Sequence, residues 1–78
     1  MKNILVLGAG LVAGPLVRYL MDQPDFHVTV ASRTLSKAER LVGSHPRGAA
    51  YQLDVEDEAT LEALIRQTDL AISLLPYA

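Results

Sequence analysis

Cysteine is absent from the 78-residue sequence, and aromatic residues make up only 5% of it. Without cysteine there is no disulfide, no thiolate nucleophile and no thiolate metal ligand, and the expected compartment is the cytoplasm. His27 and His45 have no partner at the spacing of a zinc motif, so the sequence predicts no metal site. We expect both histidines to be structural or solvated rather than catalytic.

Long apolar runs and an excess of positive charge are missing as well. The run from Ile4 to Leu7 stops at Gly8, far short of the roughly 18 residues that span a bilayer. No secretory signal is expected, because glycines and Pro15 would interrupt its apolar segment, and residue 1 is expected to be the true start. The formal net charge is −2, from 7 Lys and Arg against 9 Asp and Glu. We therefore expect neither nucleic acid nor a membrane as a partner, and any bound anion has to be held locally.

Apolar residues are plentiful for so short a chain. Half of the residues are hydrophobic and the mean hydropathy is +0.21. A chain of this size buries only roughly 60 to 65% of the surface that its unfolded form exposes. The length allows one domain, over residues 1–78, and no more.

Apolar periodicity and turn residues predict four strands that alternate with three helices. The predicted elements are a strand over 3–7, a helix over 11–20, a strand over 26–31, a helix that begins at Thr34 or at a Ser36–Glu39 capping box and ends at Gly43, a strand over 49–53, a helix over 58–67 headed by Asp57, and a strand of the wholly buried type over 70–75. The order βαβαβαβ predicts an α/β fold with a three-layer, Rossmann-type parallel sheet, and right-handed crossovers give the strand order 3-2-1-4. We expect two helices on one face, the third on the other, and an exposed edge at the fourth strand.

A glycine-rich turn joins the first predicted strand to the first helix. Residues 8–13 read Gly-Ala-Gly-Leu-Val-Ala and match G-x-G-x-x-[G/A]. In this motif the first glycine, here Gly8, makes the tight bend, the second, Gly10, lets the backbone approach a pyrophosphate, and the small Ala13 lets the helix pack close to the strand. The helix N-terminus then offers free N–H groups to the diphosphate. The motif favours dinucleotide binding over the alternative, in which the glycines only allow tight packing.

The segment after the second predicted strand contains no acidic residue between Asp25 and Glu39. NAD-specific turns place an acid there, about 20 residues after the glycine motif, on the ribose 2′-hydroxyl. A guanidinium can instead clamp a 2′-phosphate, and hydroxyls can donate to it. Ser32, Arg33 and Thr34 stand at this place, with Lys37 one turn later. Each of them alone would be interpreted as a solvated cation or a helix cap. Together they favour NADP(H) over NAD(H).

Two further segments fall at the carboxyl ends of strands, where open parallel sheets bind nucleotides. Asp54 and Val55 follow the third strand, where a carboxylate can accept from the adenine amino group, although Asp54 is almost as well explained as a turn or capping residue. Leu74, Leu75 and Pro76 close the fourth strand beside the glycine turn. There they can flank the ribose and the nicotinamide.

Four segments of the chain together resemble a known family. They are residues 6–12 with Pro15, residues 28–34 (VTVASRT), residues 53–55 (LDV) and residues 69–77 (DLAISLLPY). These are similar to the N-terminal part of the glutamate-forming, saccharopine reductase type of saccharopine dehydrogenase. Gly14 departs from the pattern, because close relatives tend to have Arg before the proline. The resemblance implies NADP(H) binding by Gly10, Leu11, Val12 and Ala13, by Ser32, Arg33 and Thr34, by Asp54 and Val55, and by Leu75 and Pro76.

The reaction that the resemblance implies is reversible hydride transfer at the CH–NH bond of a secondary amine. NADPH would reduce the imine of glutamate and 2-aminoadipate 6-semialdehyde to saccharopine, in lysine metabolism. Polyamine-forming relatives such as carboxynorspermidine dehydrogenase are an alternative.

The family's substrate domain and catalytic groups would lie beyond residue 78, so we expect half of a Rossmann domain without catalytic residues. The amino-acid substrate would bind only to a longer parent protein. Another alternative is a stand-alone nucleotide-sensing or protein-interaction module. We expect the chain alone to self-associate or to be marginally stable.

Overall fold

Strands and helices alternate along the whole of the described chain, which comprises residues 1–8, 13–43, 45–54 and 56–74 of a computed structural model. The element order βαβαβαβ is as predicted. The elements are β1 (Lys2–Leu7), α1 (Ala13–Met21), β2 (Phe26–Ser32), α2 (Leu35–Val42), β3 (Gly48–Gln52), α3 (Glu58–Arg66) and β4 (Leu70–Ser73).

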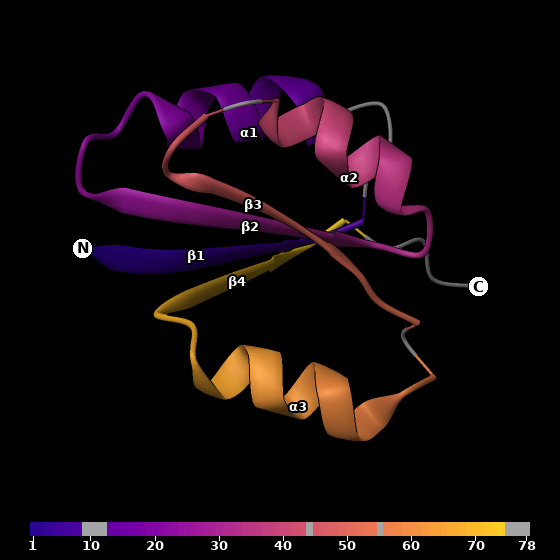
Figure 1. The fold of residues 1–78 in the computed structure, drawn as a ribbon. Coiled ribbons are helices and arrows are strands. Elements are labelled where there is room, and N and C mark those ends of the chain that lie inside the picture. The colour runs from indigo at the N-terminus through magenta and orange to yellow at the C-terminus, as the bar shows by residue number, and fades with distance from the viewer. Residues whose placement is uncertain (9–12, 44, 55, 75–78) are drawn as a thin grey trace.

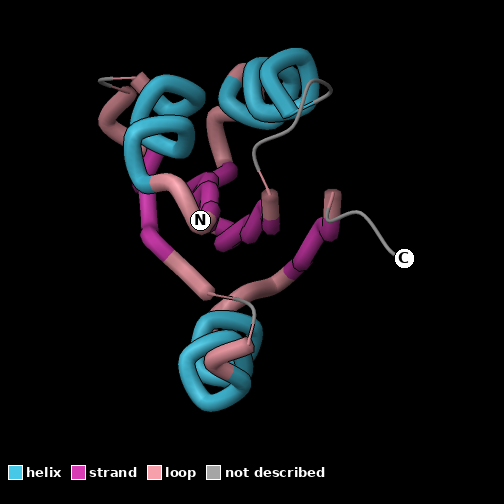
Figure 2. The backbone as a smooth tube through the Cα atoms, turned by 90° about the vertical axis from the view of Figure 1, so that its right-hand side faces the viewer, coloured by secondary structure: helices cyan, strands magenta, loops and turns pink. Residues whose placement is uncertain are grey.

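The four strands form one parallel sheet in the order β3-β2-β1-β4, which confirms the predicted topology. Lys2 pairs with Phe26, and Ile4 pairs with Leu70. Figure 1 shows α1 and α2 over one face of the sheet and α3 over the other, and Figure 2 shows the same three layers after a turn of 90°. Because all strands run in the same direction, their carboxyl ends lie along one side of the sheet. This side is called the carboxyl edge, and it is distinct from the edge strands β3 and β4.

The α1/α2 face of the sheet holds most of the core. Strand residues that alternate along β1 and β2 are almost completely buried there, beneath the apolar stripes of the two helices. Full burial of each such aliphatic side chain stabilises the fold by about 1.5 to 3 kcal/mol. The cluster consists of Ile4, Val6, Val17, Leu20, Met21, Val28, Val30, Ala38 and Val42.

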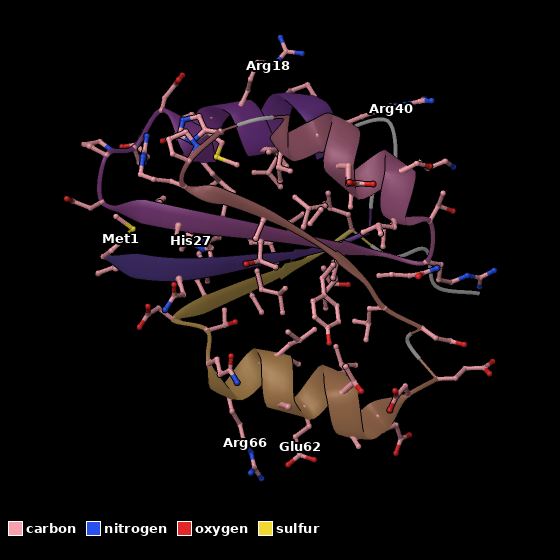
Figure 3. The ribbon with its side chains drawn as sticks, viewed as in Figure 1. Met1, Arg18, His27, Arg40, Glu62 and Arg66 are labelled. Atoms are coloured by element: carbon pink, nitrogen blue, oxygen red, sulfur yellow. The ribbon has the colours of Figure 1, made fainter. Side chains whose placement is uncertain are left out.

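The α3 face is less well covered. Leu5, Leu7 and Ala31 are buried there with Leu53. The helix contributes only half-buried leucines to this cluster, and none of its residues is fully buried. Its outer side carries the exposed ion pair Glu62–Arg66, which points away from the sheet as Arg18 and Arg40 do on the other side (Figure 3). An exposed pair of this kind adds about 0.3 to 0.5 kcal/mol.

Two local predictions were wrong. The predicted wholly buried strand is β4, of which only Ile72 is half-buried while Leu70 is 50% exposed, because β4 pairs with β1 alone and forms the edge of the sheet. The Ser36–Glu39 capping box is not formed, because α2 begins at Leu35 and so contains Ser36. Thr34, the alternative cap, occupies the N-cap position without a side-chain hydrogen bond.

Two other predicted helix ends are confirmed. Gly43 ends α2 with a φ of 57°, and its N–H donates to the Glu39 carbonyl at 2.8 Å. Asp57 caps α3, where its carboxylate accepts from the N–H of Thr60 at 3.2 Å and from the Thr60 hydroxyl at 2.7 Å. The bond from the hydroxyl, and then the bond from the N–H, hold the pKa of Asp57 below its ordinary value of 3.8.

Candidate functional site

The carboxyl edge of the sheet gathers the described residues that the sequence predicts for a nucleotide site. Backbone hydrogen bonds continue the strand pairing past the strand ends. The N–H of Gly8 donates to Ala31 O at 2.8 Å, and the N–H of Leu53 donates to Ser32 O at 2.9 Å. The N–H of Leu74 donates to Leu7 O at 2.8 Å. The segments after β1, β2, β3 and β4 therefore lie next to one another along this edge.

The start of the glycine turn has the backbone that the motif requires. Gly8 has a φ of 101°, in the region that side-chain-bearing residues rarely adopt. Ala13, at the first position of α1, is completely buried, so a larger side chain would push the helix away from the sheet. Both observations fit the predicted roles of a tight bend and a close helix–strand approach. The predicted contacts of Gly10, Leu11 and Val12 lie outside the described residues.

The turn between β2 and α2 presents cations to solvent from a fixed backbone. Arg33 and Thr34 are exposed, and Lys37 is exposed in the first turn of α2. The Ser32 hydroxyl oxygen accepts from the N–H of Thr34 at 3.2 Å. Within the described ranges, the Arg33 guanidinium has no hydrogen bond or ion pair. Its N–H donors therefore face solvent, in a segment without acids, and are available to an anion.

Gln52, the last residue of β3, is a member of this site that the sequence analysis missed. Its side-chain Nε2 donates to Arg33 O at 3.2 Å. The bond is possible because Gln52 pairs with Ser32, the residue before Arg33, in the register between β2 and β3. The signal available in the sequence was its place near the end of the predicted strand over 49–53, two residues before the predicted Asp54 and Val55 segment. That signal is weak, because it depends on the register between β2 and β3.

Asp54 has a structural role that the sequence left open. Its Oδ1 accepts from the N–H of Glu56 at 3.0 Å, and its carbonyl accepts from the N–H of Asp57 at 2.9 Å. This is the turn alternative, which leads the chain from β3 into α3. The adenine contact of Asp54 stays a prediction, and Val55 lies outside the described residues.

Leu74 brings backbone rather than side chain to the edge of the sheet. Its N–H is bonded to Leu7 O, next to the glycine turn. Its half-buried side chain packs against the core of the α1/α2 face. The predicted contacts of Leu75 and Pro76 lie outside the described residues.

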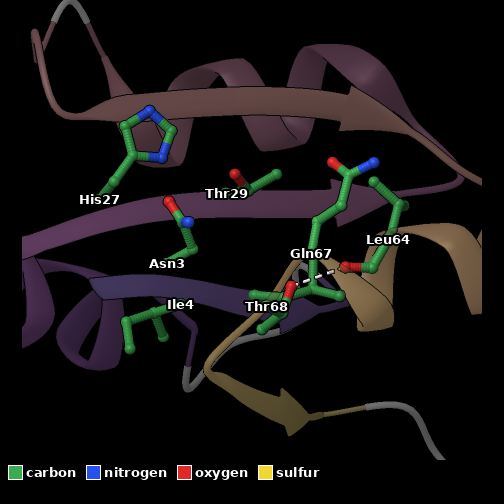
Figure 4. A pocket seen from close by; sticks show the side chains of 8 residues that line it. Asn3, Ile4, His27, Thr29, Leu64, Gln67 and Thr68 are labelled. Atoms are coloured by element: carbon green, nitrogen blue, oxygen red, sulfur yellow. Dashed lines mark hydrogen bonds between the residues drawn. The ribbon is translucent and has the colours of Figure 1, made fainter. Parts of the chain in front are cut away.

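A cavity of about 200 Å³ lies on the α3 face near the amino ends of the strands, away from this edge (Figure 4). His27 and Thr29 of β2 line it together with Asn3 of β1 and the end of the α3 segment, where the Thr68 hydroxyl donates to Leu64 O at 2.7 Å.

The other histidine, His45, accepts a hydrogen bond at Nδ1 from the N–H of Arg47 at 3.1 Å.

The described residues form neither a metal site nor a membrane span. In residues 1–8, 13–43, 45–54 and 56–74, no group of three or more His, Cys, Asp or Glu side chains is placed to hold a metal ion. In the same ranges, no helix is long and apolar enough to cross a membrane.

A family model and several relatives of known name are similar to this chain. Residues 4–78 match the family described as saccharopine dehydrogenase NADP binding domain. Saccharopine dehydrogenase [NADP(+), L-glutamate-forming] of Schizosaccharomyces pombe is 49% identical over 77 residues, which cover 99% of this chain and 17% of that protein. Mitochondrial alpha-aminoadipic semialdehyde synthase of Mus musculus is 34% identical over 76 residues, covering 97% of this chain and 8% of that protein.

A solved structure shows the same fold. The apo form of the histidine-tagged saccharopine dehydrogenase (L-Glu forming) from Saccharomyces cerevisiae matches with a TM-score of 0.90 at 42% identity. The match covers 99% of this chain and 17% of the yeast chain. The Rossmann-type fold predicted from the sequence is thereby confirmed, for a segment that spans 17% of this relative.

Proposed function

Because this chain belongs to the saccharopine dehydrogenase NADP-binding domain family, which residues 4–78 match, we propose that the carboxyl edge of its sheet binds the adenosine half of NADP(H). The family match and the fungal relative confirm the predicted family and the predicted cofactor, NADP(H). The observation that carries the placement of the cofactor is the exposed Arg33, whose guanidinium has no partner within the described ranges.

The residues at this edge divide between two charged groups of the cofactor. The turn that begins at Gly8, together with the N-terminus of α1, binds the diphosphate, because free N–H groups at a helix start favour an anion. Arg33 and Lys37 bind the 2′-phosphate, with the hydroxyls of Ser32 and Thr34 as further donors. No acid lies between Asp25 and Glu39 to repel that phosphate.

The remaining predicted residues bind the uncharged parts of the cofactor. We propose that Asp54 and Val55 contact the adenine and that, in the protein to which this domain contributes, Leu74, Leu75 and Pro76 contact the ribose and the nicotinamide. When bound, NADP(H) supplies or accepts the hydride. The described residues of this chain bind and orient it, and we assign none of them to proton transfer.

The first experiment compares binding of 2′,5′-ADP and 5′-AMP by calorimetry. We expect the chain to prefer 2′,5′-ADP by about 10- to 100-fold, because hydrogen bonds to a charged group contribute about 1.5 to 3 kcal/mol. Arg33→Met should remove most of this preference and leave 5′-AMP binding unchanged. Arg40→Met is the matched control, since Arg40 lies on α2 and points away from the sheet (Figure 3). Equal binding of both ligands would contradict the assignment, and binding of neither would favour an interaction module.

The activity that we propose for the protein to which this domain contributes is oxidoreduction at the CH–NH bond of a secondary amine. The substrates would be glutamate and 2-aminoadipate 6-semialdehyde, joined as saccharopine. The names of the fungal relatives and the chain's 49% identity to one of them support this proposal over a polyamine-forming reaction.

A chimera tests that activity. This chain would replace the corresponding segment of the Saccharomyces cerevisiae enzyme, whose backbone it matches with a TM-score of 0.90. NADPH oxidation with the two substrates at a rate close to that of the parent enzyme supports the proposal. A folded chimera that oxidises no NADPH contradicts it.

We also propose that the isolated chain self-associates. Leu70 is 50% exposed on the edge strand β4, and Ile65 and Tyr51 are 44% and 42% exposed. Sedimentation velocity should show species larger than the monomer, and Leu70→Lys should reduce them. A monomer at all concentrations would count against this proposal.

A further inference from the structure

The peptide unit between Arg33 and Thr34 is held at both of its polar ends. Its N–H belongs to Thr34 and donates to the Ser32 hydroxyl oxygen at 3.2 Å. Its C=O belongs to Arg33 and accepts from Gln52 Nε2 at 3.2 Å. Because a peptide unit is planar, these two bonds fix its rotation about the chain direction.

The bond from Gln52 restrains where the Arg33 side chain starts. It ties the Arg33 carbonyl group, and with it the Arg33 Cα to which the carbonyl carbon is bonded, to the end of β3. Ser32 is in turn held by strand pairing, because its carbonyl accepts from the N–H of Leu53 at 2.9 Å and it pairs with Gln52. Gln52 therefore links the end of β3 to the backbone position from which the exposed Arg33 side chain extends.

We infer that Gln52 is a positioning residue that sets the preference for NADP(H) over NAD(H). It acts through Arg33 rather than by contact with the cofactor, and the inference rests on the proposed binding of the 2′-phosphate by Arg33. A turn whose backbone is already ordered loses less conformational entropy when it binds a ligand, so its hydrogen bonds contribute more to affinity. Without the Gln52 bond, the turn would have to be ordered at the moment of binding.

The amide is the chemically suitable group at this position. Its NH₂ donates to a carbonyl and brings no charge to the edge of the sheet. A glutamate of nearly the same size has no N–H to donate, and its carboxylate would repel a 2′-phosphate held by the neighbouring turn. Gln52→Glu should therefore weaken 2′-phosphate binding more than Gln52→Met does.

A double-mutant cycle tests the inference, with affinity for 2′,5′-ADP and for 5′-AMP as the readout. We expect Gln52→Met to lower the affinity for 2′,5′-ADP about three- to tenfold, the size of one net hydrogen bond, and to leave 5′-AMP binding unchanged. In the Arg33→Met background, the same substitution should change 2′,5′-ADP binding less than twofold, because residues that act through one another are not additive.

The matched control is Gln67→Met, since Gln67 is an exposed glutamine that lines the cavity near the other end of the sheet. Thermal unfolding of each variant separates a loss of fold from a loss of positioning. Gln52→Glu should lower the affinity for 2′,5′-ADP further than Gln52→Met does, and this additional loss of affinity should shrink at high salt because it is electrostatic. The salt dependence can be measured even if Gln52→Met lowers the stability of the fold. Faster hydrogen exchange at the Thr34 amide in Gln52→Met would show the released peptide directly.

The two possible failures are distinguishable. If Arg33→Met leaves 2′,5′-ADP binding unchanged, the proposed function itself fails. If Arg33→Met weakens it but Gln52→Met does not, or if the two substitutions weaken it independently, the role of Gln52 is overturned and the proposed function stands.

Discussion

Arg33 and Arg47 lie at opposite edges of the sheet and use the same kind of side chain in different ways. Arg47, just before β3, donates from its guanidinium to Met21 O at 2.7 Å, to Phe26 O at 3.1 Å and to Gln23 O. Arg33, just after β2, is exposed, and its guanidinium has no hydrogen bond or ion pair to any residue that the structure describes. Arg47 stabilises the fold, whereas Arg33 is the arginine for which we propose a ligand.

The difference follows from what surrounds each arginine. Met21 ends α1, and the last carbonyls of a helix have no partner within it, so a cation nearby is stabilised. The opposite edge of the sheet faces the N-termini of helices, which offer N–H groups and attract anions instead. The fate of an arginine in this fold therefore depends on which end of the strands it occupies.

The largest effect is expected from a charge reversal at the carboxyl edge. Arg33→Asp should weaken NADP(H) binding about 100-fold, because a carboxylate repels the 2′-phosphate that a guanidinium binds. NAD(H) binding should stay equal or improve, since a carboxylate at this position can accept from the ribose 2′-hydroxyl. The free energy of unfolding should change by less than about 0.5 kcal/mol. Calorimetric titration with both cofactors checks this. An unchanged preference for NADP(H) over NAD(H) would contradict the proposal that Arg33 binds the 2′-phosphate.

The arginine at the amino edge should behave in the opposite way. Arg47→Met should lower the free energy of unfolding by about 1 to 3 kcal/mol, because half-buried carbonyls lose their donors. Affinity for 2′,5′-ADP should remain within twofold of the original in the folded variant. Urea unfolding of Arg47→Met and Arg33→Met side by side measures the contrast. Equal free energies of unfolding for the two variants would contradict the structural role of Arg47 at the amino ends of the strands.

A smaller effect is expected from His45, which supports Arg47 at the same edge. His45 Nδ1 accepts from the N–H of Arg47 and so holds the turn that leads into β3. His45→Phe should cost about 1 kcal/mol of unfolding free energy through the loss of this bond. The preference between 2′,5′-ADP and 5′-AMP should not move. If the preference falls together with stability, the two edges are not independent.

The smallest effect concerns an acid near the carboxyl edge that serves the fold. The hydrogen bonds from Thr60 lower the pKa of Asp57, so the charged carboxylate is stabilised in the folded state relative to the unfolded chain. This contribution is present above the ordinary value of 3.8 and is lost as the pH falls below it through the pKa of the folded state. Asp57→Asn should therefore flatten the pH dependence of unfolding below about pH 4, as measured by urea unfolding at several pH values. Parallel pH profiles for the two proteins would contradict this role.

Much of the fold was predictable because it depends on short-range patterns. Buried runs such as Ile4–Leu7 and the helical stripes predicted the strands and helices, and the right-handed crossover rule then predicted the strand order and the layers. The capping box failed because Thr34, two residues earlier, already occupies the N-cap position. The wholly buried fourth strand failed because its apolar composition is typical of a strand covered on both faces, whereas the edge position that the predicted strand order gives this strand is confirmed.

The site was predictable only in part. Gly8 and the Arg33 turn follow from local motifs, and the structure places both at the carboxyl edge. Gln52 in the site, and Arg47 at the opposite edge, were missed, because their hydrogen bonds cross between segments that are distant in the sequence. Such contacts depend on strand register and loop conformation, which local patterns do not encode.

The most direct test of the claim that the carboxyl edge is the nucleotide site is an NMR titration of the isotope-labelled chain with 2′,5′-ADP. We expect amide shifts to change at this edge and to stay constant at Met21, Arg47 and Gln67 near the other end. Shifts that change around Arg47 or the cavity at Gln67, or that do not change anywhere, would contradict it. The amides expected to move are those of Gly8, Ser32, Arg33, Thr34, Lys37 and Asp54.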